Sequence, residues 1–213
     1  MTLAYSPDTA AAPAIVELMD RVGLKMTFAK GEEIFGQDED ADMIHSLVSG
    51  VVRTTRLLSD GRRQVGDFYY PGDVIGLEIG DAYRFSAEAL TDCVIRVVKR
   101  SSLAALSGKD NLDRALWEAT RRELERTQEH LLMLGRKSAC EKVASFLRDV
   151  AQRDGSDEVS LPMGRQDMAD YLGLTIETVS RMVTQLQGSQ IVEFATSRLF
   201  RVTRWPALER LAA

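Results

Sequence analysis

The side chains whose types and spacing could do chemistry lie close together, in residues 176–181. On an α-helix, Glu177, Ser180 and Arg181 would share one face, and Ile176 would border it. An arginine can donate two hydrogen bonds to guanine, a glutamate can accept one from cytosine, and a serine can bond either kind of base edge. We therefore expect these four side chains to contact DNA bases in a major groove. A surface salt bridge between Glu177 and Arg181, worth about 0.3–0.5 kcal/mol, is compatible with that role.

The elements that must position these side chains are predicted by residues 165–186. A first helix is expected to end before Gly173, because glycine readily takes the left-handed conformation that closes a helix. Thr175 is a good N-cap for a second helix. Ala169, Gly173 and Val179 have the spacing of a helix–turn–helix, with an ordinary helical hairpin as the alternative. The expected shared core is Met168, Leu172, Leu174, Val179, Met182 and Leu186.

Two short β-strands are expected after the second helix, in residues 191–195 and 199–203, with residues 158–161 as a third. The turn between the first two ends at Arg198. A hairpin at this place is the wing of a winged helix–turn–helix, and Arg198 at its tip would meet DNA phosphate. The expected phosphate contacts are Thr175, Thr178, Arg165 and Arg198.

A long helix is predicted upstream, from Asn111 to Leu134. Its apolar and threonine positions alternate in steps of three and four, as in the seam of a coiled coil. They are Trp117, Thr120, Leu124, Thr127, Leu131 and Leu134. The length favours a two-chain coiled coil, although a narrow stripe could also pack on the preceding domain. Gly135 is expected to interrupt this helix as a hinge, before a second helix in residues 140–151 and a polar loop in residues 152–158.

Residues 28–98 alternate apolar and polar side chains over short runs that end in turn signals such as Ser59-Asp60-Gly61. Several short strands at this spacing indicate a small β-sandwich or barrel. The sequence thus predicts an α+β fold in three parts. These are a β-roll domain in residues 1–109, a dimerisation helix in residues 110–135 and a winged helix–turn–helix domain in residues 136–213.

The charge is unevenly distributed between the two ends of the chain. Residues 1–134 carry 16 basic and 22 acidic side chains, a net charge of -6, whereas residues 135–213 carry 11 basic and 10 acidic, a net charge of +1. A modest basic face suffices for a dimer that contacts phosphates at two half-sites. No stretch approaches the ~20 apolar residues of a membrane span, and residues 1–14 lack the pattern of a signal peptide, so we expect a cytoplasmic protein.

Enzyme chemistry finds little support in the sequence. The predicted roll contains a single histidine, His45, so the metal site of a cupin-like enzyme lacks its ligands. No His-Glu-x-x-His, Gly-x-Ser-x-Gly or phosphate-binding loop occurs. The two cysteines, Cys93 and Cys140, lie far apart, which argues against a disulfide framework, a structural zinc site or an iron–sulfur cluster. We expect no enzyme activity, metal or cofactor.

Three motifs resemble the Crp/Fnr superfamily of bacterial transcription regulators over essentially the whole chain: Gly-Asp-Val-Ile-Gly at 72–76, the long helix, and Glu-Thr-Val-Ser-Arg at 177–181. Residues 57–65, 130–136 and 161–181 resemble its FixK-like branch. The resemblance implies an N-terminal double-stranded β-helix like that of cyclic-nucleotide-binding proteins. It also implies a homodimer that binds double-stranded DNA at a TTGA…TCAA palindrome, through Glu177, Ser180 and Arg181. Activation of genes for low-oxygen metabolism or nitrogen fixation, with RNA polymerase as a partner, is implied as well.

The chain departs from the superfamily's effector sites. Members that bind cyclic AMP carry a Gly-Glu pair and an Arg-Ser pair where this chain has Gly76-Leu77 and Phe85-Ser86. Glu78 and Arg84 lie one residue off each site, and a one-residue slip would turn a strand residue to the opposite face. A phosphate facing Phe85 would lose its charge-assisted hydrogen bonds. We expect no cyclic-nucleotide effector.

Other superfamily sensors are also poorly matched. The oxygen sensor of the Fnr type needs a cysteine cluster near the N-terminus, and no cysteine precedes Cys93. A haem would need an axial ligand, and His45 and His130 are interpreted instead as surface or internally satisfied residues. Gly164 replaces the redox-sensitive cysteine of some FixK proteins. The alternative hypothesis is a regulator gated by a small molecule in the roll that moves the hinge at Gly135.

Overall fold

The computed structural model describes residues 12–78, 80–107 and 109–213. The chain divides into two compact units, one up to Arg126 and the other from Thr127 to Ala213. The domain boundaries predicted after residues 109 and 135 remain predictions. They divide the chain by function, whereas these two units are divided by compactness.

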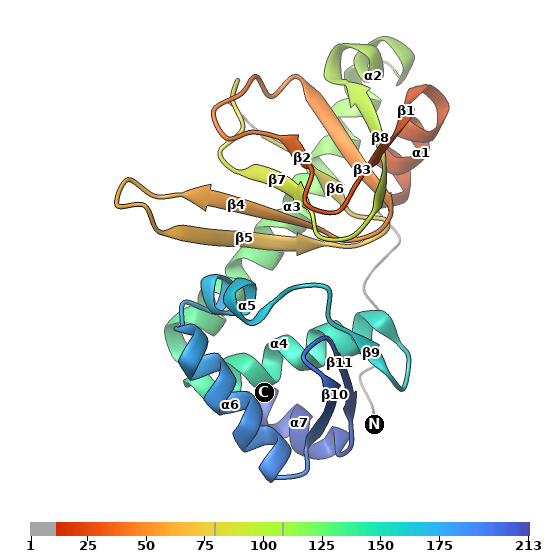
Figure 1. Ribbon diagram of the computed structural model, residues 1–213. Coiled ribbons are helices and arrows are strands. Elements are labelled where there is room, and N and C mark those ends of the chain that lie inside the picture. The colour runs from red at the N-terminus through yellow and green to blue at the C-terminus, as the bar shows by residue number, and fades with distance from the viewer. Residues whose placement is uncertain (1–11, 79, 108) are drawn as a thin grey trace. The chain divides into compact units, whose positions relative to one another are not determined.

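The N-terminal unit is built around two four-stranded antiparallel sheets, in the strand orders β1-β8-β3-β6 and β2-β7-β4-β5 (Figure 1). The strands are β1 (Leu24–Phe28), β2 (Glu33–Phe35), β3 (Met43–Ser49), β4 (Val52–Leu57), β5 (Arg63–Tyr69), β6 (Val74–Ile75), β7 (Ser86–Ala89) and β8 (Cys93–Lys99). Strands β4 and β5 form the expected hairpin, with Gly61 at φ 83° in its turn. The predicted β-roll is confirmed.

Alternating side chains of the two sheets face each other and form the core of the roll. Phe35, Val52 and Ala87 come from one sheet, and Leu47 and Ile95 from the other, all buried in a single cluster. The period of two in a β-strand places every second residue on this inner face. The apolar members of the alternating runs therefore supply the core of the roll.

A second apolar cluster joins the outer face of the roll to three helices, α1 (Ala12–Val22), α2 (Arg100–Ser107) and the start of α3 (Lys109–Arg136). From α3 it includes Leu112, Ala115 and Ala119, which recur at helical spacing on one face. Farther along the same helix, Arg126 forms an ion pair with Asp67 of β5. Helix α3 is thus held on the roll as far as Arg126, by both apolar and ionic contacts.

The predicted coiled-coil stripe lies on α3 away from that apolar contact. Trp117, Leu124 and Leu131 are 68%, 56% and 68% exposed, and they lie seven residues apart. Of the other stripe residues, Thr127 is exposed, and Thr120 and Leu134 are half-buried. Large apolar side chains at this spacing remain open to solvent in a single chain, so the coiled coil stays a prediction.

The expected interruption at Gly135 is wrong, because α3 continues through Gly135 and ends at Arg136. A glycine inside a helix costs only about 1 kcal/mol relative to alanine, and the neighbouring residues favour a helix. The break comes at Lys137 and Ser138, where Ser138 and Glu141 form a capping box that starts α4 (Ala139–Asp154). Helix α4 also extends three residues into the polar loop expected from residue 152.

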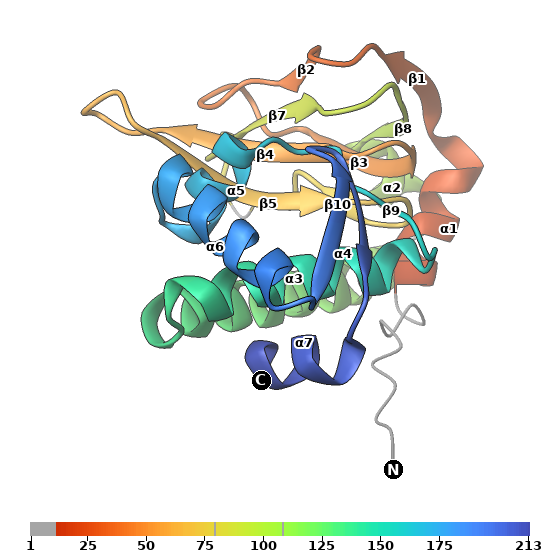
Figure 2. The same ribbon diagram turned by 60° about the horizontal axis from the view of Figure 1, so that its bottom comes forward.

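The C-terminal unit contains α4, α5 (Arg165–Leu172), α6 (Ile176–Gly188) and α7 (Trp205–Ala212). Its three-stranded sheet has the order β10-β11-β9, from β9 (Val159–Ser160), β10 (Val192–Thr196) and β11 (Leu199–Val202). In Figure 2, the hairpin of β10 and β11 follows α6, and α7 closes the unit. The winged helix–turn–helix predicted from the sequence is confirmed.

Candidate nucleic-acid interface

The turn between α5 and α6 is fixed by its glycine and by the threonine cap. Gly173 has φ 62° and ψ 41°, and its N–H donates to the carbonyl of Ala169. Leu174 N–H donates to the same carbonyl at 3.0 Å. Thr175 then caps α6, because its Oγ1 accepts a hydrogen bond from the N–H of Thr178 at 3.2 Å. Both local predictions, the left-handed glycine and the threonine cap, are confirmed.

One face of α6 is buried in the unit. Val179, Val183 and Leu186 are inaccessible to solvent or nearly so. Of the other expected core residues, Met168 and Leu172 are buried, whereas Leu174 and Met182 are half-buried. The sequence prediction missed Val183, although its position four residues after Val179 was the signal for it. This burial determines which side of α6 faces solvent.

The opposite face presents the four predicted base contacts. Glu177, Ser180 and Arg181 are exposed, and Ile176 is 37% exposed although it is a large apolar residue. The pKa of Glu177 is lowered by a backbone hydrogen bond at the start of α6 and by the Thr175 hydroxyl, so its carboxylate is ionised. No ion pair joins Glu177 to Arg181 in the described part of the chain. The structure therefore brings these residues to one open surface, with the Glu177 carboxylate beside the Thr175 hydroxyl.

Two arginines lie near the start of α5. The guanidinium of Arg165 lies 4.5 Å from the centre of the Phe194 ring, and that ring stacks on Phe200 at 5.1 Å. Burial and the charge of Arg198 lower the pKa of Arg165. Arg198 extends from the wing turn and donates to the carbonyls of Leu161 and Pro162. The wing thus carries one arginine and supports the other, and Phe194 is a supporting residue that the sequence prediction missed.

The predicted phosphate-contact threonines lie at the start of α6. Thr175 and Thr178 share a hydrogen bond between their hydroxyls at 3.1 Å, at the first turn of α6. Thr175 is exposed and Thr178 is half-buried. Helix N-termini offer unpaired N–H groups and a favourable dipole to anions such as DNA phosphate. The first turn of α6 therefore has the chemistry that a phosphate contact needs.

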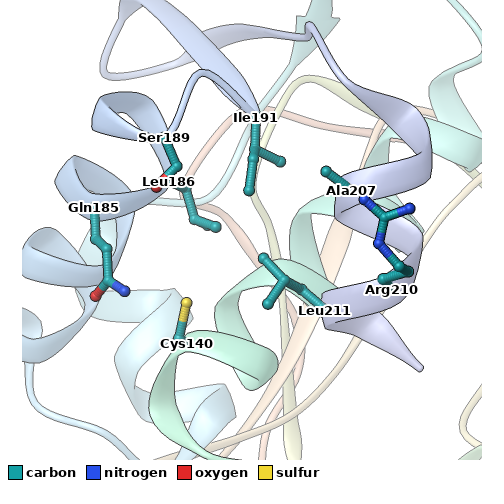
Figure 3. A pocket seen from close by; sticks show the side chains of 8 residues that line it. All are labelled: Cys140, Gln185, Leu186, Ser189, Ile191, Ala207, Arg210 and Leu211. Atoms are coloured by element: carbon teal, nitrogen blue, oxygen red, sulfur yellow. The ribbon is translucent and has the colours of Figure 1, made fainter.

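A cavity of about 350 Å³ lies on another side of the same unit, among α4, α6 and α7 (Figure 3). Leu186, Ile191 and Leu211 line it, and the sulfur of Cys140 points into it. Burial and the nearby charge of Glu141 raise the pKa of the Cys140 thiol, which keeps it protonated. Because the thiolate is the reactive form, this thiol is not activated.

The charged residues beside the effector positions of the roll contact each other, and Phe85 at one of those positions packs against its own sheet. Glu78 and Arg84 pair with each other, with Oε2 and Nε 2.8 Å apart. The ring of Phe85 packs so closely on Gly66 that a Cβ there would lie 2.8 Å from it. Among the described residues, no group of three or more side chains is arranged to hold a metal ion.

The two histidines differ from each other. His45 is buried beside the stacked rings of Phe35 and Tyr83, and its Nδ1 has no hydrogen-bond partner among the described residues. Burial lowers the pKa of His45 to about 4, against a hydrogen bond with the backbone of Ile75, so it is neutral at pH 7. His130 is half-buried and bonds to the carbonyl of Tyr171 at 3.0 Å, as expected for a satisfied residue.

Comparisons with known proteins agree with this architecture. The Crp-like helix-turn-helix domain matches residues 141–211, and the cyclic nucleotide-binding domain matches residues 25–110. The nitrogen fixation regulation protein FixK of Azorhizobium caulinodans is 47% identical, over 99% of this chain and 87% of its own. The transcriptional activatory protein AadR of Rhodopseudomonas palustris is 40% identical, over 84% of this chain and 78% of its own.

The solved structure of FixK2 from Bradyrhizobium japonicum is similar with a TM-score of 0.85 and 45% identity, covering 90% of this chain and 98% of FixK2. Within the described residues, no helix is both long and apolar enough to span a membrane. The fold, the helix–turn–helix and these relatives establish that the chain belongs to the Crp/Fnr superfamily of DNA-binding transcription regulators, in its FixK-like branch.

Proposed function

We propose that the protein activates transcription as a homodimer that binds a TTGA…TCAA palindrome, with α6 of each protomer in the major groove of one half-site. The observation that carries the proposal is the division of α6 into two faces. Val179, Val183 and Leu186 hold the helix in the unit, whereas Glu177 and Arg181 extend from it into solvent. A helix supported in this way can enter a groove without losing its own core.

Each side chain on the open face has a matching base edge in that palindrome. The guanidinium of Arg181 can donate to O6 and N7 of guanine, and the ionised carboxylate of Glu177 can accept from N4 of cytosine. The hydroxyl of Ser180 can bond either kind of edge, and Ile176 can pack on a thymine methyl group. The four contacts together distinguish G·C from A·T pairs within a half-site.

Phosphate contacts would hold α6 in register. Thr175 and Thr178 lie at the first turn of α6, and Arg165 and Arg198 lie near the start of α5. A guanidinium held over an aromatic ring loses less conformational freedom when it binds phosphate. These four residues give affinity that does not depend on sequence, and the base contacts add the specificity.

A second protomer would cover the exposed stripe of α3. Trp117, Leu124 and Leu131 expose large apolar surfaces along one line of the helix. Burial of apolar area stabilises association by about 25 cal/mol per Å². Two parallel copies of this helix would place two α6 helices on one duplex with two-fold symmetry, which a palindrome requires.

We propose that binding needs neither a cyclic nucleotide nor an iron–sulfur cluster. The packing of Phe85 supports the first part, since its ring has no donor for a phosphate, and Glu78 and Arg84 pair with each other. The names of the relatives suggest control of nitrogen fixation. Such a regulator would act on chromosomal DNA in the cytoplasm, in contact with RNA polymerase.

The proposal is tested by selecting bound duplexes from a random pool with the purified protein and no added effector. We expect enrichment of a two-fold symmetric TTGA…TCAA sequence. Enrichment only after a small-molecule extract is added would favour the alternative regulator gated through its roll. No enrichment in either case would overturn the DNA target.

A further inference from the structure

The C-terminal end of α5 leaves carbonyl groups that the helix itself does not satisfy. The last four carbonyls of any helix have no intrahelical donor. The N–H groups of Gly173 and Leu174 both donate to Ala169 and so do not reach the last residues of α5. The carbonyls of Tyr171 and Leu172 take their donors from side chains of α3 and α4.

His130 of α3 supplies the first of these donors. Its Nε2 lies 3.0 Å from the carbonyl oxygen of Tyr171, so Nε2 must carry the proton. The same imidazole stacks on the Tyr171 ring, with 4.0 Å between centroids and 16° between planes. The ring of Phe146 from α4 lies 5.8 Å from Tyr171 and supports the stack. A single side chain of α3 therefore fixes both the backbone and the side chain at the end of α5.

Lys142 of α4 supplies the second donor. Its Nζ lies 3.3 Å from the carbonyl oxygen of Leu172. A cation at this place also interacts favourably with the negative end of the α5 dipole. Next to it, Cδ2 of Leu134 lies 3.7 Å from where a Cβ at Gly173 would be. Contacts from α3 and α4 thus converge on the turn that precedes α6.

We propose that His130 is a positioning residue that fixes the angle and distance of α6 from the dimer helix, and thereby the spacing between half-sites that the dimer accepts, while Lys142 holds the end of α5 on α4. Leu131 and Leu134 of the predicted seam lie on the same turns of α3 as His130. The inference rests on the proposed function, since α6 must enter the groove and α3 must pair. Spacing between half-sites is a geometric property of the distance between the two recognition helices.

The test compares two substitutions of His130, each of which removes one of its two contacts with Tyr171. His130→Phe keeps an aromatic ring for the stack but removes the donor, and His130→Gln keeps a donor but removes the ring. Gln128→Ala, at an exposed position two residues away on the same helix, is the matched control. Fluorescence anisotropy measures binding to the palindrome with the preferred spacer, to palindromes with one base pair more or less, and to a duplex with one half-site.

We expect His130→Phe to bind the preferred palindrome up to about tenfold more weakly, because α6 is no longer held at one angle once a part-buried hydrogen bond is lost. Its affinity for the altered spacings and for the single half-site should change by less than about twofold, so the preference for one spacing falls. His130→Gln should recover part of the preference, and Gln128→Ala should behave like the wild type. Sedimentation should show that all variants are dimers.

Two results would overturn the positioning role while leaving the proposed function intact. One is an unchanged spacing preference in His130→Phe, and the other is an equal loss on the palindrome and on the single half-site. A wild type with no preference for the palindrome would instead contradict the proposed function. If His130→Phe does not fold, His130→Gln makes the same test through the lost stack on Tyr171, with Gln128→Ala as its control.

Discussion

We expect the sequence specificity of this protein to come from single residues on α6. The sequence was sufficient to predict Glu177, Ser180 and Arg181 on an open face, because their spacing agrees with a helix and their types suit base edges. The sequence alone did not predict the residues that support this face. Phe194 and Tyr171 act through partners distant in the sequence, Arg165 and His130, which no local pattern connects.

Replacement of Arg181 by alanine should weaken binding to the palindrome by about 1–3 kcal/mol and remove discrimination at one G·C pair in each half-site. Anisotropy with single-pair variants of the duplex measures this. Gln187→Ala, an exposed residue on the same helix, is the control and should leave affinity unchanged. An equal loss on every duplex would make Arg181 a phosphate contact instead.

The buried His45 should give the fold a pH dependence. Its pKa is about 4 in the folded protein, against an ordinary value of 6.5 for an exposed histidine in an unfolded chain. Since the unfolded state binds the proton more readily, stability is full above pH 6.5 and decreases as pH falls toward 4. Between pH 7.5 and pH 5 the wild type should lose about 2 kcal/mol through this group. Urea denaturation of His45→Gln at both pH values should show a smaller difference, and an identical one would refute the assignment.

Among the helices and strands, the predicted helix ends were accurate where the sequence carries a strong local signal. The end of α5 and the start of α6 were correctly predicted, because Gly173 and Thr175 are strong local signals. The end of α3 was placed too early, at Gly135. That prediction gave a tolerated glycine more weight than the Ser-x-x-Glu capping box three residues later, which was also visible in the sequence.

Substitution of Gly173 by alanine tests the turn. The left-handed conformation costs an alanine about 1–2 kcal/mol, and the surrounding space holds only an ordinary contact with Leu134. We expect thermal unfolding to show this loss in Gly173→Ala and a smaller one in Gly173→Asn, since asparagine tolerates the conformation better. Equal stability of Gly173→Ala and wild type would show that the turn is not held in this conformation.

In the whole molecule, the exposed apolar stripe of α3 is the feature that still needs a partner. The β-roll and the winged domain were predictable because each closes its own core. The exposed stripe was predictable as a pattern, but a single chain contains no partner for it. Both faces of α3 carry apolar residues, and only the contacts of the folded chain show that Ala115 and Ala119 pack on the roll while Leu124 and Leu131 remain open.

A double substitution, Leu124→Glu with Leu131→Glu, should abolish the dimer, because charges at a coiled-coil seam repel and cannot be buried cheaply. Sedimentation equilibrium measures the oligomeric state. Glu118→Gln with Glu125→Gln on α3 is the control for changed charge and should remain dimeric. A dimeric Leu124 and Leu131 variant would refute the coiled coil and, with it, the symmetric presentation of α6.

The most direct measurement is the affinity of the purified protein, without any effector, for a TTGA…TCAA duplex and for the same duplex with both half-sites scrambled, at physiological salt. We predict a ratio of at least about 10³ in favour of the palindrome, with two protomers bound to each duplex. Equal affinity for the two duplexes would contradict sequence-specific recognition by the exposed face of α6.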